Sequence, residues 1–309
     1  MTPKDFISIA DWPRASIEAI LRRAAELKAL RRECSPVRSL EGKSVLLYFE
    51  KPSLRTYVTF GVGVSELGGT PVYLPPGQVQ MGDREAIEDV ARNLSCWCDA
   101  LVARTFSHRL VVELARHGSM SVINGLTDDL HPCQAIADAL TISEVGDLES
   151  DRLVYIGDGN NVANSLINLA GVLGMRLTVC TPEGFEPGSA FVERGQALAE
   201  LSGAEIVLEN DPHAAVKGAS FVYTDVWASM GQEEEAEARR RAFRGYQVDT
   251  DLLASAPAGA RVLHCLPAHR GEEISAEVME SGQVLVFDQA ENRLHAQKAI
   301  LEALLAPDT

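Results

Sequence analysis

Residues 44–56 read SVLLYFEKPSLRT, and this stretch indicates the class of fold. The apolar run Ser44–Phe49 has the length and composition of a buried strand. Polar residues follow at once, and Pro52 suits the first turn of a helix that we expect to run through Val64. A buried strand that leads directly into a helix is the repeating unit of a parallel α/β sheet.

The same alternation of short apolar runs and helical patterns continues along the chain. The first half has expected strands at Ser44–Phe49, Pro71–Leu74, Ala100–Thr105 and Ser121–Asn124. The second half has expected strands at Arg152–Asp158, Arg176–Pro182, Glu205–Glu209, Phe221–Asp225, Val262–Leu266 and Val284–Asp288. Helical patterns include Ala86–Leu94, Gln134–Ser143 and Asn161–Leu173. The pattern predicts two doubly wound parallel-sheet domains.

The length of 309 residues suits about two domains, and an acidic connector, EVGDLESD at 144–151, separates the two series of strands. We therefore expect one domain over residues 1–145 and a second over 146–290. The stretch from Glu291 to Leu305 is predicted to be a single helix with leucines available for packing. The charge run Gln232–Arg244 is predicted to be a solvated helix or loop.

Composition limits the class of function. A formal net charge of −16 argues against general nucleic-acid binding, which requires a basic face. No stretch approaches the roughly 20 consecutive apolar residues of a membrane helix. The acidic start MTPKDFISIADWP lacks the pattern of a signal or transit peptide. The six cysteines form no C-x-x-C pair, which favours free thiols in a reducing compartment. We expect a soluble, cytoplasmic protein without nucleic-acid or membrane partners.

Polar residues at the carboxyl ends of strands are the first candidates for chemistry, because open parallel sheets bind ligands at that edge. Ser53, Arg55 and Thr56 follow one strand, and Arg104 ends another. Hydroxyls, guanidinium groups and the free N–H groups of a helix start would together bind an anion. The plainer interpretation is a Ser/Thr helix cap beside a surface arginine.

A second candidate set lies in DDLHPCQ, at residues 128–134. Pro132 suits a first helical position, which places His131 at the cap and Gln134 in the first turn. Aimed from a helix start, the imidazole and the amide would polarise a carbonyl group. A capping histidine with a solvated glutamine is the plainer alternative.

The stretch GDGNNVANS, from residue 157, is open to two interpretations. Gly157 and Gly159 resemble a dinucleotide fingerprint, with Glu183 as the acid that would bind the ribose. Val162, however, occupies the third glycine position, which weakens an NAD-dependent oxidoreductase. In the alternative, Asn161 is an amide at a helix start that binds a ligand.

The last candidates follow two later strands. Asp225 ends the strand Phe221–Asp225 and is either a binding carboxylate or a cap. Cys265 lies in RVLHCLPAHR, but His264 is a poor base for it, because strand neighbours point to opposite faces. A zinc site formed by His264, Cys265 and His269 matches no usual ligand spacing, so no metal site is expected.

Taken together, these stretches resemble the aspartate/ornithine carbamoyltransferase family, and within it the branch that acts on ornithine. The stretch PSLRT is similar to the carbamoyl-phosphate loop S-T-R-T of the family. Further family blocks follow in the family's order: VARTF, HPCQAIADALTI, GDGNNVANSL, DVWASMG, HCLPAHRG and ENRLHAQKAI. Each block alone is weak to moderate, whereas the ordered set covers nearly the whole chain and is specific.

The resemblance implies transfer of a carbamoyl group from carbamoyl phosphate to the δ-amine of ornithine, a reaction of arginine metabolism that needs no metal or organic cofactor. It also implies a carbamoyl-phosphate-binding domain at 1–145, an ornithine-binding domain at 146–290, and a final helix, 291–309, that returns to the N-terminal domain. The carbamoyl phosphate ligands it implies are Ser53, Leu54, Arg55, Thr56, Gln80, Arg104, His131, Gln134, Cys265, Leu266 and Arg293. The ornithine ligands are Asn161, Asp225, Ser229 and Met230. The catalytic set is Arg55, Arg104, His131, Gln134, Asp225 and Cys265.

The family is built on a catalytic trimer in which the residue matching Gln80 serves a neighbouring subunit, so the resemblance implies a homo-oligomer. Three residues depart from the family pattern. Leu54 and Val90 stand where threonine is common, and Tyr57 replaces an arginine after the motif. These departures leave other acceptors open, namely putrescine or an N-acylated ornithine. A paralogue that binds metabolites without catalysis is a further alternative.

Overall fold

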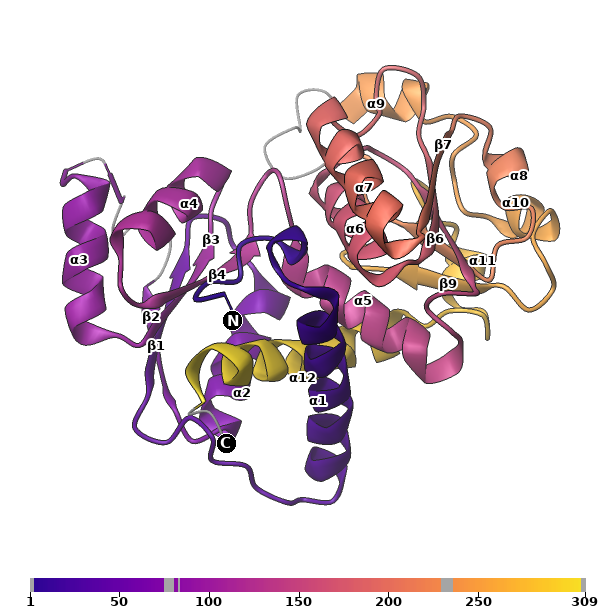
Figure 1. Cartoon of the computed structure of the whole chain (residues 1–309). Coiled ribbons are helices and arrows are strands. Elements are labelled where there is room, and N and C mark those ends of the chain that lie inside the picture. Colours follow the sequence, from indigo (N-terminus) through magenta and orange to yellow (C-terminus); the bar gives the residue numbers. More distant parts are fainter. Residues whose placement is uncertain (1–2, 75–80, 83, 229–235, 307–309) are drawn as a thin grey trace. The chain divides into compact units, whose positions relative to one another are not determined.

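The computed structural model describes residues 3–74, 81–82, 84–228 and 236–306. It contains two compact units (Figure 1). Unit 1 comprises Met1–Leu140 with Glu291–Thr309, and unit 2 comprises Thr141–Ala290. The prediction of two parallel α/β domains is confirmed, because each unit is built around one sheet whose paired strands are all parallel.

The sheet of unit 1 contains four strands in the order β2-β1-β3-β4. The strands are β1 (Ser44–Phe49), β2 (Thr70–Leu74), β3 (Ala100–Arg104) and β4 (Ser121–Leu126). The chain moves from β1 outward to β2 and then returns past β1 to β3. The direction of winding therefore reverses between β1 and β3, which makes the carboxyl ends of these two strands the ligand-binding edge.

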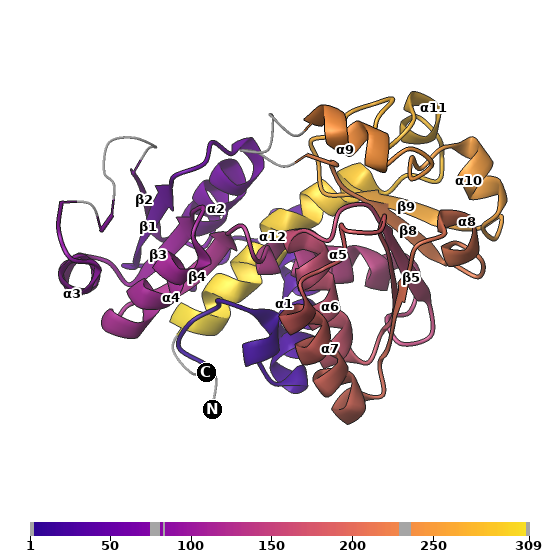
Figure 2. The same ribbon diagram turned by 90° about the horizontal axis from the view of Figure 1, so that it is seen from above.

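Helices cover both faces of this sheet. The helices are α1 (Arg14–Arg32), α2 (Leu54–Glu66), α3 (Ile87–Trp97) and α4 (His108–His117), after the short 3-10 helix η1 (Ile9–Asp11). One face packs Leu46, Tyr48 and Leu101 against apolar residues of α3 and α4. The opposite face carries α2 together with α1 and α12 (Val286–Leu305), as Figures 1 and 2 show.

The terminal helix α12 joins unit 1 through paired polar contacts. Lys28 of α1 donates to Asn292 at 2.8 Å, and Lys298 donates to Glu66 of α2 at 2.8 Å. Gly63 of α2 faces the Lys298 side chain so closely that a Cβ would lie 3.1 Å from it. The last part of the chain is therefore integral to unit 1, although it is distant in sequence from the rest of that unit.

The sheet of unit 2 contains five strands in the order β7-β6-β5-β8-β9. The strands are β5 (Arg152–Ile156), β6 (Arg176–Cys180), β7 (Glu205–Glu209), β8 (Phe221–Thr224) and β9 (Arg261–His264). The helices are α6 (Asn161–Leu173), α7 (Ser189–Ser202), α8 (Pro212–Ala215), α9 (Ala236–Ala242), α10 (Thr250–Ala254) and α11 (Ala276–Met279), and α5 (Pro132–Val145) leads into the unit. The winding reverses between β5 and β8, so their carboxyl ends form the ligand-binding edge.

Two details of the sequence-based prediction need correction. The tenth strand, expected at Val284–Asp288, is wrong: Val284 makes an isolated bridge to Val262, and α12 begins at Val286. The described part of the charge run 232–244 is not wholly solvated, because Arg239 is buried and forms an ion pair with Asp158 at 3.0 Å.

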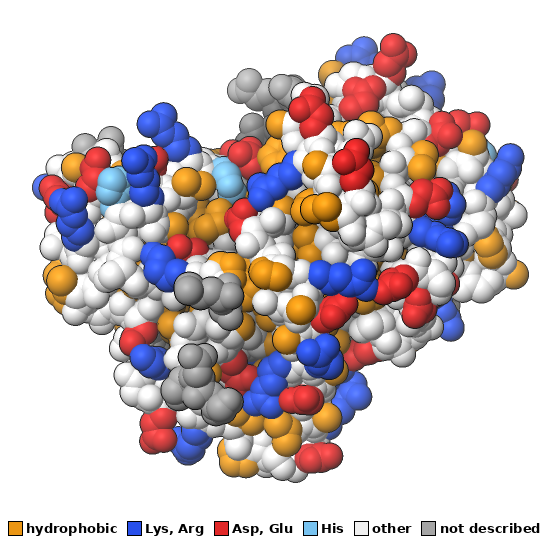
Figure 3. All heavy atoms as spheres, in the orientation of Figure 1, with side chains coloured by type: hydrophobic (Ala, Val, Ile, Leu, Met, Phe, Trp, Pro, Cys, Tyr) orange, Lys and Arg blue, Asp and Glu red, His pale blue; other side chains and the backbone are white. Residues whose placement is uncertain are grey.

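Among the described residues, no helix is long and apolar enough to cross a membrane. On the face shown in Figure 3, acidic and basic side chains are interspersed over both units. The negative charge on that face is therefore not gathered into a single acidic patch.

Candidate active site

The start of α2 forms the first part of a polar cluster in unit 1. Ser53 is the N-cap of this helix, and its hydroxyl accepts the backbone N–H of Thr56 at 3.2 Å. Ser53 is thus a helix cap, and this role does not prevent the same helix start from binding an anion. A capped first turn still directs the positive end of the helix dipole and its remaining N–H groups toward the ligand-binding edge.

Thr56 joins three segments that are far apart in sequence. Its buried hydroxyl accepts a hydrogen bond from Arg293 Nη2 at 2.7 Å and another from Arg104 Nη1 at 3.3 Å. Arg293 belongs to α12 and is itself buried, whereas Arg104 ends β3. One threonine therefore fixes two guanidinium groups beside the carboxyl ends of β1 and β3.

His131 lies immediately before α5 and is buried in the same cluster. Burial, followed by the positive charges of Arg293, Arg104 and Arg55, holds the pKa of His131 well below its ordinary value. The imidazole is therefore neutral at neutral pH, and it contributes hydrogen bonding without adding charge. Three guanidinium groups close enough to affect one histidine create a strongly positive point, which is suited to a ligand with more than one negative charge.

Gln134 supplies a buried amide one turn into α5. Its Nε2 donates to Asp138 Oδ1 at 2.7 Å, which fixes the direction of the amide plane. The opposite atom, Oε1, is buried and has no hydrogen-bond partner among the residues that the structure describes. A buried acceptor of this kind suits a ligand that carries an N–H group.

Lys51 and Leu54 lie next to these residues in sequence, but their side chains have other surroundings. Lys51 is buried, but it forms an ion pair with Asp128 and lies over the ring of Phe106, 4.3 Å from its centroid. Leu54, the first residue of α2, has a largely exposed side chain, which leaves its backbone as the part that belongs to the helix start.

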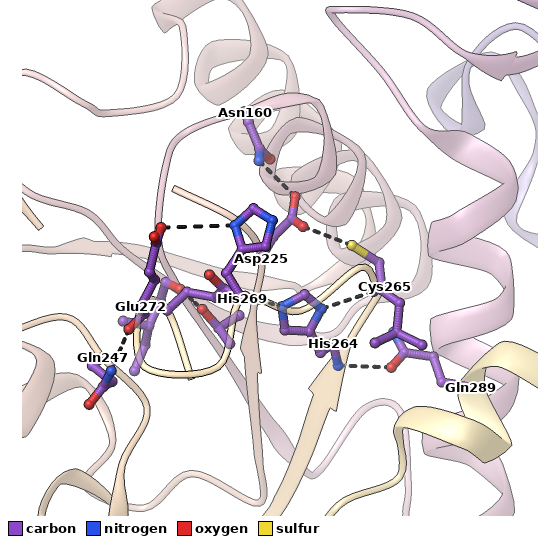
Figure 4. A network of polar contacts seen from close by, with 12 residues as sticks. Asn160, Asp225, Gln247, His264, Cys265, His269, Glu272 and Gln289 are labelled. Atoms are coloured by element: carbon purple, nitrogen blue, oxygen red, sulfur yellow. Dashed lines mark hydrogen bonds and ion pairs between the residues drawn. The ribbon is translucent and has the colours of Figure 1, made fainter. Parts of the chain in front are cut away.

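The second polar cluster lies at the ligand-binding edge of unit 2 and is shown in Figure 4. Asp225 directly follows β8, and its carboxylate is held on both sides. Asn160 Nδ2 donates to Oδ2 at 2.8 Å, and the Cys265 thiol donates to Oδ1 at 3.0 Å. Asp225 is thus a carboxylate held by side chains, rather than a helix cap.

His264 supports this cluster instead of acting as a base for Cys265. Its Nε2 contacts Glu273 Oε1 at 3.0 Å, and its Nδ1 accepts the backbone N–H of Leu266 at 2.9 Å. This pair of contacts assigns the ring proton to Nε2. The His264 backbone N–H donates to Gln289 at 2.9 Å (Figure 4). The loop at Leu266, whose φ of +58° is left-handed, is thereby held by a buried histidine.

Metal-binding atoms occur close together in two groups of described residues. Asp225, His264 and Cys265 form one group, and His269, Glu272 and Glu273 form the other, with the atoms of each group lying within 4.8 Å of one another. In the first group, hydrogen bonds within the chain already occupy both ring nitrogens of His264 and the Cys265 thiol. These nitrogen and sulfur atoms are therefore already hydrogen-bonded within the protein.

Gly159, in the loop after β5, has an explanation that does not involve a dinucleotide. A Cβ on Gly159 would lie 2.2 Å from the backbone nitrogen of Pro187 and 2.3 Å from the carbonyl carbon of Glu186. The chain's own backbone fills the space that the missing side chain leaves. This close approach requires glycine at 159 by itself.

The structure brings together seven of the fifteen sequence-predicted site residues, five in unit 1 and two in unit 2. Unit 1 gathers Arg55, Thr56, Arg104, His131 and Arg293, and unit 2 gathers Asp225 and Cys265. Asn161 is the first residue of α6. Gln80, Ser229 and Met230 lie outside the described residues.

The sequence reasoning missed three polar residues that hold these clusters. Asp138 orients Gln134, Glu273 contacts His264, and Asn160 holds Asp225. Asn160 could have been found from its position, because it directly precedes the predicted helix Asn161–Leu173, where an asparagine is a strong N-cap. No pattern along the chain links Glu273 to His264.

Two parallel-sheet units, each with a polar cluster at its ligand-binding edge, define an α/β protein that binds small polar ligands. Residues 4–144 match the family model described as the aspartate/ornithine carbamoyltransferase, carbamoyl-P binding domain. Residues 149–304 match the Asp/Orn binding domain of the same family. The chain belongs to the aspartate/ornithine carbamoyltransferase family.

Individual relatives agree with this assignment. The chain is 50% identical over 304 residues to the ornithine carbamoyltransferase of Symbiobacterium thermophilum, covering 98% of each chain. The crystal structure of ornithine carbamoyltransferase from Thermus thermophilus is 41% identical, with a TM-score of 0.88 over 99% of this chain and 100% of that one. The structure from Pyrococcus furiosus is 45% identical, with a TM-score of 0.96 over 100% of this chain and 99% of that one. These likenesses do not favour an NAD-dependent oxidoreductase.

Proposed function

We propose that this chain transfers the carbamoyl group of carbamoyl phosphate to the δ-amine of L-ornithine, giving L-citrulline and phosphate. The observation that carries the proposal is the positive cluster of Arg55, Arg104 and Arg293 around Thr56 and His131. It is built for a small, multiply charged anion, and it lies in a chain that matches the carbamoyl-P binding model. Close relatives are named ornithine carbamoyltransferases, which supports ornithine as the acceptor.

Unit 1 binds carbamoyl phosphate in this proposal. Ser53, Arg55, Thr56, Arg104 and Arg293 hold the phosphate, with the backbone N–H of Leu54 in the first turn of α2. His131, neutral because its pKa is lowered, donates a hydrogen bond toward the carbonyl oxygen. The buried Oε1 of Gln134, which has no other hydrogen-bond partner among the described residues, accepts a hydrogen bond from the carbamoyl NH₂ group.

Unit 2 binds ornithine in this proposal. Asn161, Asp225, Ser229 and Met230 contact the amino acid, and Cys265 and Leu266 from the same unit complete the set of proposed carbamoyl phosphate ligands. The Asp225 carboxylate attracts an amine, and the Cys265 thiol next to it limits how the carboxylate turns. We therefore assign residues 1–145 and 291–309 to carbamoyl phosphate and residues 146–290 to ornithine. The boundary between the two family models, at 144 and 149, supports the division near residue 145. The grouping of Glu291–Thr309 with unit 1 supports the assignment of the final helix.

The chemistry follows from these assignments. The neutral δ-amine attacks the carbonyl carbon, a C–N bond forms, and negative charge develops on the carbonyl oxygen. The C–O bond to the phosphate then breaks, and the amine loses a proton to the departing phosphate. Arg55, Arg104 and His131 stabilise the oxygens that carry the charge, and one such donor contributes about 3–4 kcal/mol. Gln134 instead orients the transferred group, through the hydrogen bond that its Oε1 accepts from the carbamoyl NH₂. Positioning of the two reactants contributes much of the remaining rate acceleration.

The acceptor is tested with purified protein, carbamoyl phosphate and a panel of amines: ornithine, putrescine and N-acetylornithine. We expect citrulline and phosphate in equal amounts, and the highest kcat/KM for ornithine. Putrescine keeps both amines of ornithine but lacks the carboxylate that Asn161, Ser229 and Met230 are proposed to help bind, so its kcat/KM should be far lower. Comparable turnover of putrescine would overturn the choice of acceptor. Bound carbamoyl phosphate without any product would favour a non-catalytic paralogue.

We also propose a cytoplasmic homo-oligomer, a trimer or a multiple of trimers, with Gln80 serving a neighbouring subunit. The six cysteines all lie among the described residues and none of them forms a disulfide, which supports a reducing compartment. A groove of about 580 Å³ between α2 and β2 supports assembly, because its lining includes the partly exposed Tyr57, Val58, Val62 and Tyr73. β2 is also an edge strand of its sheet. Gln80 follows β2 closely in sequence, so this groove and the proposed shared residue adjoin along the chain.

Val58→Glu tests the groove as the contact between copies of this chain. A charge at this position, 45% exposed in the single chain, would be buried without a partner in the assembly, so we expect dissociation to monomers. Light scattering after size-exclusion chromatography measures the mass. Val112→Glu on α4, at a site 40% exposed, is the matched control and should leave the mass unchanged. A monomeric wild-type protein would overturn the homo-oligomer, and an oligomeric Val58→Glu variant would exclude this groove.

A further inference from the structure

Asn160 connects the start of a helix with the proposed ornithine carboxylate. It is the N-cap of α6, and its Oδ1 accepts the backbone N–H groups of Val162 at 2.9 Å and Ala163 at 3.2 Å. The other end of the same amide, Nδ2, donates to Asp225 Oδ2 at 2.8 Å (Figure 4). A single side chain therefore ties Asp225, which follows β8, to the rigid first turn of α6.

The contacts fix which way the amide points. If oxygen and nitrogen were exchanged, the NH₂ group would face two backbone donors and the carbonyl oxygen would face a carboxylate. The Tyr155 hydroxyl lies 3.3 Å from Oδ1, but its single proton has a nearer acceptor in the Asp158 carbonyl oxygen at 2.8 Å. Burial and then the nearby Asp225 raise the pKa of Tyr155 well above its ordinary value, so this hydroxyl stays protonated and remains a donor. The two backbone neighbours of Oδ1 are donors and the neighbour of Nδ2 is an acceptor, so these three contacts fix the amide without Tyr155.

Asparagine at position 160 does something that the other capping residues would not. Serine, threonine and aspartate cap helices about as well as asparagine does, so capping alone does not require asparagine here. Serine has no second polar atom that would reach Asp225, and aspartate would present a second carboxylate to it. Only asparagine both caps α6 and donates to Asp225. The amide N–H that Asn160 donates to Asp225 is therefore a second role of this residue, in addition to capping α6.

The two sides of the Asp225 carboxylate are held by different chemistry. Asn160 holds Oδ2 through an amide, and Cys265 holds Oδ1 through a thiol. A turn of the carboxylate about its terminal bond would break both contacts, so the pair defines one orientation. We propose that Asn160 is a positioning residue for ornithine, whose amide holds the Asp225 carboxylate in the orientation that receives the substrate amine. This inference rests on the proposed function.

Two cap-preserving variants separate the donor from the cap. Asn160→Ser keeps a capping oxygen and removes the donor, and it should lower kcat/KM for ornithine about tenfold or more, the usual effect of losing a hydrogen bond to a charged group. The KM for carbamoyl phosphate should change much less, because most of the proposed ligands of that substrate lie in unit 1. Asp249→Asn, which exchanges the cap of α10 in the same unit, is the control and should alter neither value.

Asn160→Asp gives a signature that a purely structural role would not produce. The introduced carboxyl group and the Asp225 carboxylate share a proton at low pH, and in that state the introduced group acts as a donor and replaces the amide. At higher pH the shared proton is lost and the two carboxylates repel each other. The loss in kcat/KM for ornithine should therefore grow between about pH 5 and pH 8, whereas the loss in Asn160→Ser stays constant relative to wild type. Equal loss in both variants at every pH, or an equal rise in both KM values, would overturn the inference.

A measurement without substrate keeps the inference separate from the proposed function. In folded Asn160→Asp protein, repulsion raises the pKa of the carboxyl pair above its unfolded value, so stability is present at low pH and falls as pH rises. Between about pH 5 and pH 8, the Tm of this variant should fall by about 2–4 °C relative to Asn160→Ser. If the wild type makes no citrulline, the proposed function fails, and the Tm still tests the contact. A constant Tm difference would overturn the positioning contact itself.

Discussion

Replacing Arg55 by alanine is expected to lower kcat/KM for carbamoyl phosphate by at least about a hundredfold. Arg55 is one of three guanidinium groups whose charge lowers the pKa of His131, so it lies close to the point where the transferred group is proposed to bind. Charge on the phosphate and carbonyl oxygens grows toward the transition state, and the loss of one preorganised donor typically costs this much. Steady-state citrulline formation with carbamoyl phosphate as the varied substrate measures kcat and KM separately.

Three further variants show whether the effect belongs to this guanidinium group. Arg55→Lys keeps a charge but loses the planar fork, so an intermediate loss is expected. Arg116→Ala removes an arginine from α4 whose side chain is 72% exposed, and it should leave the kinetics unchanged. Tyr57→Arg restores the residue that usually follows the family motif and should change the KM for carbamoyl phosphate less than Arg55→Ala does. The opposite order would place Tyr57 within the binding site.

The surroundings of Tyr57 support that expected order. Its ring packs against Tyr73 with centroids 4.3 Å apart and against Phe49 at 6.2 Å. It also lines the groove between α2 and β2, which is the proposed contact between subunits. Although Tyr57 directly follows Thr56 in sequence, one helical position is enough to direct the two side chains to different surroundings: Thr56 is buried between arginines, and Tyr57 is partly exposed.

The fold could be predicted from sequence because buried parallel strands appear as short apolar runs between helical patterns. The run at Ser44–Phe49, which is almost wholly buried, has the predicted bounds, and so does the helix Asn161–Leu173. The strand Glu205–Glu209 also has its predicted bounds, although it lies at the edge of its sheet and is largely exposed. The same reasoning failed at Val284–Asp288, since a short apolar run does not distinguish a strand from the first turn of a buried helix. There the apolar side chains begin α12 instead.

The candidate site was predictable only in part, because strand ends can be located from sequence but side-chain contacts cannot. The rule that strand ends bind ligands found Arg104 and Asp225 from local pattern alone. Without the family resemblance, Arg293 would have been ignored as a surface residue, since only the path of α12 brings it to Thr56. Asn160 could have been recognised as an N-cap from its place before the predicted helix, but its contact with Asp225 depends on the fold and could not.

A buried histidine of α12 makes the stability of unit 1 sensitive to acid. His295 is fully buried, and neither ring nitrogen has a hydrogen-bond partner among the described residues. Burial lowers its pKa from 6.5 to about 4, with the nearby Lys298, Lys28 and Arg31 acting in the same direction and Glu291 opposing them. The unfolded chain therefore takes up this proton at a higher pH than the folded protein does. The resulting stability is fully present above pH 6.5 and is lost as the pH falls toward 4.

His295→Leu should remove most of this acid sensitivity. A difference in pKa from 6.5 to about 4 corresponds to on the order of 3 kcal/mol, so the wild type should lose this much more stability than the variant between about pH 7.5 and about pH 4. Urea unfolding at a series of pH values measures the free energy of unfolding of both proteins. His131 and the carboxyl groups are common to both, so their contributions cancel when one free energy is subtracted from the other. His213→Gln, at an exposed histidine, should follow the wild-type curve. Parallel curves for wild type and His295→Leu would show that His295 becomes protonated as readily in the folded protein as in the unfolded chain.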